Sequence, residues 1–519
     1  MNIIPKPNGV SELRDGKFAV EKLASVYLDG FEASCLAAFE ARIDKMLEQT
    51  SSEHATLVLR HDQELSPEGY SLLVEADKIT ITAFAEAGVI WALVTLYSLE
   101  EKGNYPAIYL EDAPRYAHRG FLLDCVRHFF PVETVKEIIE INSLSKLNVL
   151  HWTLTNDQGW RIESKVFPKL HQTDGQEFFT QDEIREVAAF AKERGVEVIP
   201  EIDMPGHTIA AIAAYPELSC AGEPVALRKQ AGISPLIFCA GNENTYDFVK
   251  ALLDEICPLF ESPYFHIGGD EAPKRNWEQC PKCQERLAGL GSDDFEDLQG
   301  YFTQVIAAHL TKLGKTTVCW NDVLASDKLP ENIVIQQWLD TKRPSRTKEF
   351  LDNGGKVVFS DMFSLYFDYP VAMTPLSKVY NYSPVIDDED FSDSPGCEGI
   401  QACLWSEKVE TKEKLYQRIY PRLFAVAEVA WTTQRDYSDF KRRLVPKLAE
   451  MSAKGIPFLA LKKSNPKGII RKIQVLKVLR TLGEVIEDDK EETLPLSPEM
   501  VAYFMEQFDI KIPKRFLPS

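Results

Sequence analysis

The pattern of apolar and polar positions divides the chain into two parts of different character. In residues 1–115, strand-like runs at 55–59 and 79–83 alternate with helix-like segments at 31–48 and 86–100, a mixture typical of a small α+β domain. The apolar stretch 87–99 is too short to span a bilayer and is expected to be a buried helix. The acidic, proline-containing stretch 111–114 is the expected boundary.

From residue 116 to about 455 the pattern becomes a strand, a loop and a helix, repeated along the chain. Eight apolar runs suited to buried strands lie at 120–124, 149–154, 196–202, 264–267, 316–319, 333–336, 356–360 and 399–403. Helices are expected at 132–147 and at 180–195, where Thr180 and Glu183 form a capping box and Gly195 suits the helix end.

Eight strands alternating with helices predict a (β/α)8 TIM barrel as the catalytic domain. A doubly wound open sheet is the alternative, and it is disfavoured because no Gly-rich phosphate loop joins a predicted strand to a helix. Residues 456–519, which include an acidic run at 487–492, are expected to form a helical C-terminal extension of unassigned role.

Composition narrows the classes of partner. The 519 residues are 45% hydrophobic and 26% charged, with a net charge of −21 and a pI of about 5.0. Such an acidic protein repels nucleic acid and acidic membrane surfaces, so neither is predicted as a partner and a small-molecule or oligosaccharide ligand is favoured. No apolar signal-peptide core follows the N-terminus, and a cytoplasmic location is expected.

The ten cysteines are expected to be free thiols. Cys125, Cys319 and Cys403 fall inside predicted strands, where a thiol behaves as a small apolar side chain. Cys280 and Cys283 form a lone Cys-x-x-Cys with no second pair at zinc-finger spacing. The sequence therefore predicts no metal site and no cofactor.

Polar and aromatic residues gather where the predicted barrel strands end, which is where barrel enzymes carry their chemistry. The eight ends supply Asp124 and Arg127, Asn156 and Asp157, Asp203 and His207, Asp270 and Glu271, Trp320 and Asp322, Trp338, Tyr366 and Asp368, and Trp405 and Glu407. Eight such clusters on one rim indicate a ligand pocket. Flat aromatic walls suit stacking on a sugar ring, and paired polar groups suit its hydroxyls.

Four motifs in this set carry a family resemblance. RHFFP at 127–131, DQGW at 157–160, DMPGH at 203–207 and HIGGDE at 266–271 resemble the signatures of family 20 glycoside hydrolases, the β-N-acetylhexosaminidases. The motifs occur in the family's order and at strand ends, and the resemblance covers about residues 1–455.

The resemblance implies exo-acting, retaining hydrolysis of terminal β-linked N-acetylglucosamine or N-acetylgalactosamine by substrate-assisted catalysis. Glu271 would act as general acid and then general base, so it must carry its proton near neutral pH. Asp270 would stay ionised and orient the acetamido N–H, and Tyr366 would hydrogen-bond the acetamido oxygen. Substrate-binding roles are implied for Arg127, Trp320, Trp338, Asp368, Trp405 and Glu407.

The relay behind the acid departs from the family pattern. His207 would lie behind Glu271, paired with an acid from the second strand, where many members have two consecutive acids. This chain has Asn156 followed by Asp157. Asp157 is the expected relay carboxylate, and Asn156 is grouped with the substrate-binding residues. The replacement of an acid by Asn156 is expected to affect the pH optimum more than the activity itself.

Other interpretations fit parts of the pattern. Asp270 and Glu271 could begin a helix, since acids favour helix N-termini. A metal-dependent barrel hydrolase would need His-x-His or His-Glu-x-x-His, and a family-18-like chitinase would need Asp-x-Asp-x-Glu; neither pattern occurs. A catalytically inactive amino-sugar-binding barrel is the alternative from another functional class.

Overall fold

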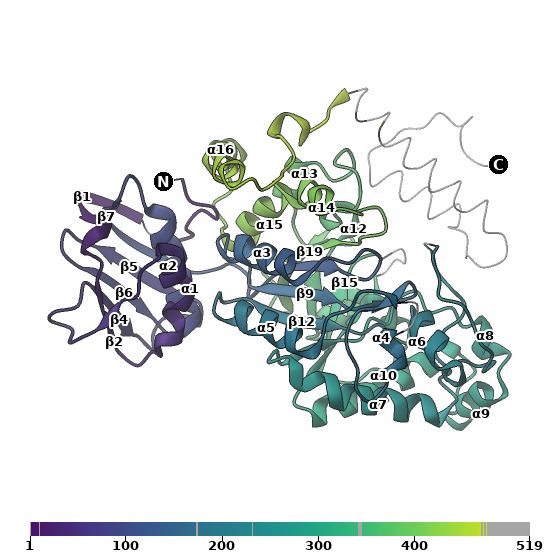
Figure 1. The fold of residues 1–519 in the computed structure, drawn as a ribbon. Coiled ribbons are helices and arrows are strands. Elements are labelled where there is room, and N and C mark those ends of the chain that lie inside the picture. The colour runs from purple at the N-terminus through teal and green to yellow at the C-terminus, as the bar shows by residue number, and fades with distance from the viewer. Residues whose placement is uncertain are drawn as a thin grey trace.

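The N-terminal part of the chain folds around one mixed sheet. The structure, a computed structural model, describes residues 2–9, 11–172, 175–230, 232–340, 345–468, 471 and 474. In the sheet, the strands run in the order β1 (Ser11–Ala19), β7 (Asn104–Asp112), β5 (Tyr70–Val74), β6 (Ile79–Ala83), β4 (Leu57–His61), β2 (Ser25–Leu28) and β3 (Glu48–Gln49). Helices α1 (Ala37–Ile43) and α2 (Glu86–Leu99) belong to the same domain (Figure 1).

The predicted elements of this domain are present with shifted bounds. The strand at 79–83 coincides with β6, and the apolar helix α2 is buried, as expected. The helix expected at 31–48 is much shorter, because a 3-10 turn (Ala33–Leu36) precedes α1 and Asp44, at φ +51°, ends it. A left-handed residue cannot continue a right-handed helix.

A closed barrel of eight parallel strands follows, and this confirms the predicted fold class over the open sheet. In chain order the strands are β8 (His118–Asp124), β9 (Val149–Thr153), β12 (Glu197–Glu201), β13 (Tyr264–His266), β14 (Thr316–Trp320), β15 (Ile333–Gln337), β16 (Lys356–Phe359) and β19 (Cys397–Leu404). Each strand neighbours the next one in the chain, and β19 pairs with β8 to close the ring.

Helices surround the strands (Figure 1). They include α3 (Val132–Ser143), α5 (Gln181–Lys192), α7 (Glu243–Ile256), α10 (Phe295–Lys312), α15 (Arg422–Trp431) and α16 (Tyr437–Ala453). The capping box of Thr180 and Glu183 is formed at the start of α5, and Gly195 takes φ +69° just after it. Those two predictions are confirmed.

A buried ionic contact joins the two domains. Lys146 of the barrel places its Nζ 2.9 Å from Asp112 Oδ2, and both side chains are fully buried. Trp431 of α15 donates to Asp112 Oδ1 at 2.9 Å and packs within the core of the N-terminal domain. Breaking such a pair leaves an uncompensated buried charge, so this contact fixes how the two domains meet.

Most of the predicted C-terminal extension, including the acidic run at 487–492, lies outside the described residues. Its described beginning contains a short 3-10 helix, Leu461–Lys463, and Ser464 accepts the Leu376 N–H at 3.0 Å through its carbonyl oxygen. Within the described part of the chain, no helix is long and apolar enough to cross a membrane.

Candidate active site

A left-handed turn at the end of β13 brings two adjacent carboxylates to one side. Gly268 and Gly269 have φ values of +67° and +95°, and Glu271 has φ +46°. A Cβ on Gly268 would lie 1.8 Å from Asp203 Oδ1, so only glycine fits there. Neighbours on an extended strand point to opposite faces, and this turn removes that obstacle for Asp270 and Glu271.

Both carboxylates reach the same imidazole. His207 Nε2 lies 3.4 Å from Glu271 Oε2 and 3.8 Å from Asp270 Oδ2. His207 itself lies in the loop after β12, at φ +53°. The predicted association of His207, Asp270 and Glu271 is therefore present in the structure.

Asp157 stands on the far side of the same imidazole. His207 Nδ1 lies 3.4 Å from Asp157 Oδ2, while Asp157 Oδ1 accepts the Ile209 N–H at 3.2 Å. Asn156 is only 2% exposed, and its Oδ1 accepts the Asp157 N–H at 2.9 Å. The structure thus pairs the imidazole with Asp157, and the substrate-binding role of Asn156 stays a prediction.

The charges around His207 favour its protonated form. Burial lowers the pKa of His207, but the carboxylates of Asp157 and Glu271, together with Asp203, outweigh burial and hold the pKa well above its usual value. The imidazolium lies between acids on both sides. It can therefore hold a proton next to Glu271 and stabilise negative charge there.

In the free enzyme, the environment of Asp270 favours its protonated form. Burial raises its pKa well above the usual range, and the nearby charges of Asp322 and Glu271 raise the pKa further while His207 opposes them. A group with N–H or positive charge bound against this carboxylate lowers its pKa. Ionisation of Asp270 is therefore coupled to the binding of such a group.

Asp322 and Asp203 are two site acids to which the sequence assigned no role. Asp322 Oδ1 accepts the Glu271 N–H at 3.2 Å, and its Oδ2 accepts the Trp338 indole N–H at 2.7 Å. Asp203 is buried and accepts the Gly269 N–H at 3.4 Å. Both stand at predicted strand ends, and Asp203 also opens the DMPGH motif at 203–207, but neither signal assigned a role.

Aromatic side chains form one cluster beside the acids. The rings of Trp320 and Trp405 lie 5.9 Å apart, and Trp338 stacks on Tyr366 at 6.2 Å with an interplanar angle of 19°. Tyr369, which the sequence did not single out, stacks on Tyr366 at 6.5 Å. The four predicted aromatic residues therefore share one site, as a sugar-binding wall requires.

Trp320 is oriented by a buried acid. Its indole Nε1 donates to Glu201 Oε1 at 2.9 Å, and Glu201 is fully buried at the end of β12. Glu201 also lies 3.0 Å from Nδ1 of His266, its partner on the neighbouring strand β13. This contact holds the indole plane in place because a charge-assisted hydrogen bond is short and directional.

Arg127 anchors a polar group at another edge of the site. Its guanidinium lies 3.3 Å from Asp124, donates to Gln158 Oε1 at 3.1 Å and lies 3.6 Å from Glu407. It also stands over the Trp405 ring at 5.1 Å. Arg127 from the end of the first barrel strand and the pair Trp405 and Glu407 from the end of the eighth are thus neighbours.

Asp368 completes this polar edge. Burial, with the nearby charge of Glu407, raises the pKa of Asp368 to about 7. Its Oδ1 is buried and has no hydrogen-bond partner among the described residues. A buried acceptor without a partner is costly, so Asp368 is suited to receive a donor such as a sugar hydroxyl.

Three groups of side chains converge closely enough to consider metal binding: Cys220 with Cys239, Cys280 and Cys283; His151 with Glu201 and His266; and Asp203 with His207 and Asp270. The third includes the imidazole whose elevated pKa favours a cation, whereas a metal ligand must be neutral imidazole. The first corrects the sequence interpretation of a lone Cys-x-x-Cys, because Cys220 and Cys239 join the pair from distant positions.

Comparisons with known proteins agree with this geometry. The model for "Glycosyl hydrolase family 20, catalytic domain" matches residues 116–434, and that for "Glycosyl hydrolase family 20, domain 2" matches residues 1–113. A beta-hexosaminidase of Porphyromonas gingivalis is 32% identical, and the match covers 88% of this chain and 64% of that protein. A beta-hexosaminidase of Vibrio furnissii is 33% identical, with 82% and 76% covered.

Solved structures give the same result. The beta-N-acetylhexosaminidase of Bacteroides fragilis superimposes with a TM-score of 0.81 at 31% identity, over 90% of this chain and 99% of that one. An exo beta-N-acetylglucosaminidase of Vibrio harveyi, solved with N-acetylglucosamine, gives a TM-score of 0.77 at 31% identity, over 89% and 78%. The barrel, the acid pair and these matches together show that the chain belongs to glycosyl hydrolase family 20, the family of the β-N-acetylhexosaminidases.

Proposed function

We propose that this family 20 enzyme removes terminal, non-reducing β-linked N-acetylglucosamine and N-acetylgalactosamine from oligosaccharides, with retention of configuration. One observation carries the proposal. The adjacent carboxylates Asp270 and Glu271 lie 3.8 and 3.4 Å from a single nitrogen of His207. Side chains so close together serve one side of a sugar, whereas an enzyme nucleophile and an acid would flank the bond from two sides.

The reaction begins with attack by the substrate itself. The acetamido oxygen at C2 forms a bond to the anomeric carbon while the glycosidic bond breaks, and Glu271 delivers its proton to the leaving oxygen. Asp270, ionised once the acetamido N–H is bound, accepts that N–H and stabilises the cyclic oxazolinium cation. Tyr366 donates to the acetamido oxygen and so orients it for attack.

In the second step Glu271 acts as a base. It removes a proton from water, which opens the oxazolinium ring at the anomeric carbon and restores the original configuration. His207, protonated between Asp157 and Glu271, stabilises the carboxylate that Glu271 becomes after the first step. The charge of His207 thus supports Glu271 as proton donor in the first step and as proton acceptor in the second.

The polar edge and the aromatic cluster supply binding. Trp320, Trp338 and Trp405 offer apolar faces to the sugar ring and the acetamido methyl group. Arg127, Asp368 and Glu407 hold ring hydroxyls, with Asp368 Oδ1 as an acceptor that lacks a protein partner among the described residues. We also propose a reducing compartment such as the cytoplasm, since none of the ten cysteines forms a disulfide.

The direct test is hydrolysis of p-nitrophenyl β-N-acetylglucosaminide and its galacto-configured counterpart. Wild type releases p-nitrophenol from both, and Glu271→Gln loses about 10²-fold or more in kcat because general acid–base catalysis contributes that much. Glu278→Gln, the same change at an exposed acid in α8 (Arg275–Glu278), retains full activity. Inactive wild type over pH 4–9, or a fully active Glu271→Gln, would overturn the proposal in favour of an inactive sugar-binding barrel.

A further inference from the structure

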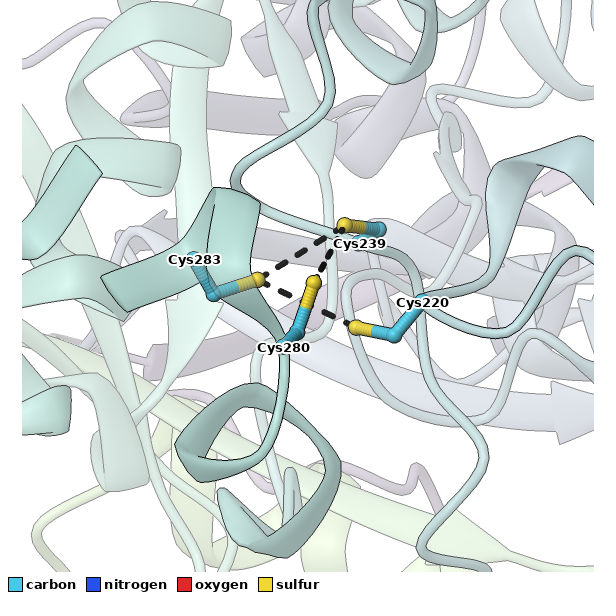
Figure 2. A group of neighbouring side chains, drawn as sticks. All are labelled: Cys220, Cys239, Cys280 and Cys283. Carbon is cyan, nitrogen blue, oxygen red and sulfur yellow. Dashed lines mark hydrogen bonds between the residues drawn. The ribbon is translucent and has the colours of Figure 1, made fainter. Parts of the chain in front are cut away.

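Four cysteines from three separate segments point toward one centre beside the barrel (Figure 2). Cys220 follows the 3-10 helix Pro216–Leu218, and Cys239 follows the bridge between Ser219 and Phe238. Cys280 is the N-cap of α9 (Pro281–Gly289), and Cys283 lies in the first turn of that helix. All four sulfur atoms lie within 4.8 Å of one another.

The spacing of the sulfurs suits a single tetrahedral metal ion. Cys239 Sγ lies 3.6 Å from Cys283 Sγ and 3.8 Å from Cys280 Sγ, and Cys220 Sγ lies 3.8 Å from Cys283 Sγ. A disulfide would require about 2.05 Å. In a tetrahedron with Zn–S bonds of about 2.3 Å, neighbouring sulfurs are about 3.8 Å apart. The sulfurs are too close together to enclose a cluster of several iron atoms.

The surrounding backbone is built to hold these thiols together. Cys239, Cys280 and Cys283 are buried and Cys220 is half-buried. Gly241 lies directly against the turn that carries Cys283, since a Cβ there would come within 2.2 Å of the Lys282 carbonyl carbon. The Gly241 N–H also donates to Cys239. Only glycine permits this close approach of two chain segments.

We propose that Cys220, Cys239, Cys280 and Cys283 bind one Zn²⁺ ion as a structural tetrathiolate site. Four protein ligands leave no open coordination position, so the ion takes no part in the chemistry of the sugar. All four ligands are thiolates, which favours zinc over magnesium or calcium, ions that prefer oxygen. The cysteines are unpaired and therefore available as ligands.

The ion would tie together the two loops that carry the reacting groups. Phe238, next to Cys239, donates its N–H to Pro205 O at 3.0 Å, in the loop that ends in His207. Trp277 lies between Glu271 and Cys280 along the chain and donates its indole N–H to Phe238 O at 2.8 Å. The site thus joins the segment after β12 to the segment after β13. This consequence for catalysis rests on the proposed function, whereas zinc binding itself does not.

The test measures metal on the full-length protein, expressed without a metal-binding tag and purified with a reductant and no chelator. We expect one zinc per chain, and X-ray absorption at the zinc edge should show four sulfur neighbours at about 2.3 Å. Cys220→Ser, at the half-buried ligand, should lose most of the zinc and lower the Tm. Cys35→Ser, the same change at a buried thiol of the N-terminal domain, should keep one zinc.

A second measurement covers the case in which Cys220→Ser fails to fold. Titration of wild type with an organomercurial thiol reagent should block the four thiolates and release the zinc. A chromogenic chelator measures the released zinc. Protein without zinc even after exposure to zinc chloride, iron in its place, or a disulfide among the four cysteines would each overturn the proposal. Metal is counted without substrate, so an inactive protein that holds one zinc would refute the proposed function and leave the metal site standing.

Discussion

Asp322 is expected to be a positioning residue for the acid pair, and Asp322→Ala tests this directly. It follows β14 and accepts two hydrogen bonds, one from the Glu271 N–H at 3.2 Å and one from the Trp338 indole at 2.7 Å. The first contact fixes the backbone of the general acid, and the second fixes a ring of the sugar wall. Alanine removes both acceptors while leaving every side chain that touches the substrate.

The magnitude follows from these two bonds. A hydrogen bond to a charged group contributes about 1.5 kcal/mol or more net, so the two together contribute about 3 kcal/mol. Each 1.36 kcal/mol corresponds to a tenfold change in rate. If both bonds hold the geometry that the transition state needs, Asp322→Ala lowers kcat/KM by about 10²-fold.

Two further variants separate the bonds. Trp338→Phe removes the indole donor and keeps a smaller aromatic face, while the Glu271 N–H still binds Asp322, so it should cost about tenfold in kcat/KM, mainly through KM. Asp322→Asn keeps one acceptor oxygen and should fall between the wild type and Asp322→Ala. Steady-state kinetics on p-nitrophenyl β-N-acetylglucosaminide, with circular dichroism as the folding control, measures all three. Folded Asp322→Ala within threefold of wild type would refute the reasoning.

Asp322→Asn is also expected to shift the pH profile of kcat/KM. The charge of Asp322 raises the pKa of Asp270, so removing it lowers that pKa. Asp270 must be ionised to receive the acetamido N–H. The acidic limb of the kcat/KM profile in Asp322→Asn should therefore move to lower pH, whereas a limb that moves to higher pH would contradict the assigned role of Asp270.

The remaining predictions concern other parts of the site. The pKa of His207 is raised on folding, so its cation stabilises the fold below about pH 6.5, and this contribution fades as pH rises through the folded pKa. In chemical denaturation, the free energy of unfolding that His207→Gln loses should therefore shrink with rising pH, and a constant difference would contradict this. Gly268→Ala drives a Cβ into Asp203 and should abolish activity and lower Tm. The control Gly289→Ala, with open space around its Cβ, should leave activity unchanged and Tm unchanged or slightly higher. Equal behaviour of the two variants would refute the steric argument. Arg127→Lys keeps the charge but loses the planar fork, so KM should rise about tenfold, and an unchanged KM would remove Arg127 from the binding site.

Much of the fold was predictable because barrel strands bury both faces. Their apolar runs stand out between amphipathic helices, and the strand ends then mark one rim. Residues such as Trp405 and Arg127 lie far apart in the sequence, yet the closed ring made their proximity expected. The helix predicted at 31–48 failed for a local reason, the left-handed residue Asp44, which hydrophobic periodicity does not reveal.

The cysteine cluster and the raised pKa of Asp270 were not predictable from the sequence, because both depend on the paths of long loops and on contacts between different strands. Cys220 and Cys239 belong to a long connection between β12 and β13, and 18 residues separate them. Their spacing matches no known metal-ligand motif, so it did not predict that they lie close to Cys280. The raised pKa of Asp270 likewise arises from burial among acids of other strands, Asp322 among them. Such effects come from side chains that folding alone brings together.

In the proposed mechanism the substrate provides its own nucleophile. The most direct measurement compares kcat/KM for p-nitrophenyl β-N-acetylglucosaminide with that for the matched glucoside, which carries a hydroxyl in place of the acetamido group. Intramolecular attack corresponds to effective molarities of about 10⁵ M or more, so the glucoside should react at least about 10³-fold more slowly. Equal rates, or a covalent sugar ester on a carboxylate of the protein detected by mass spectrometry, would contradict the account.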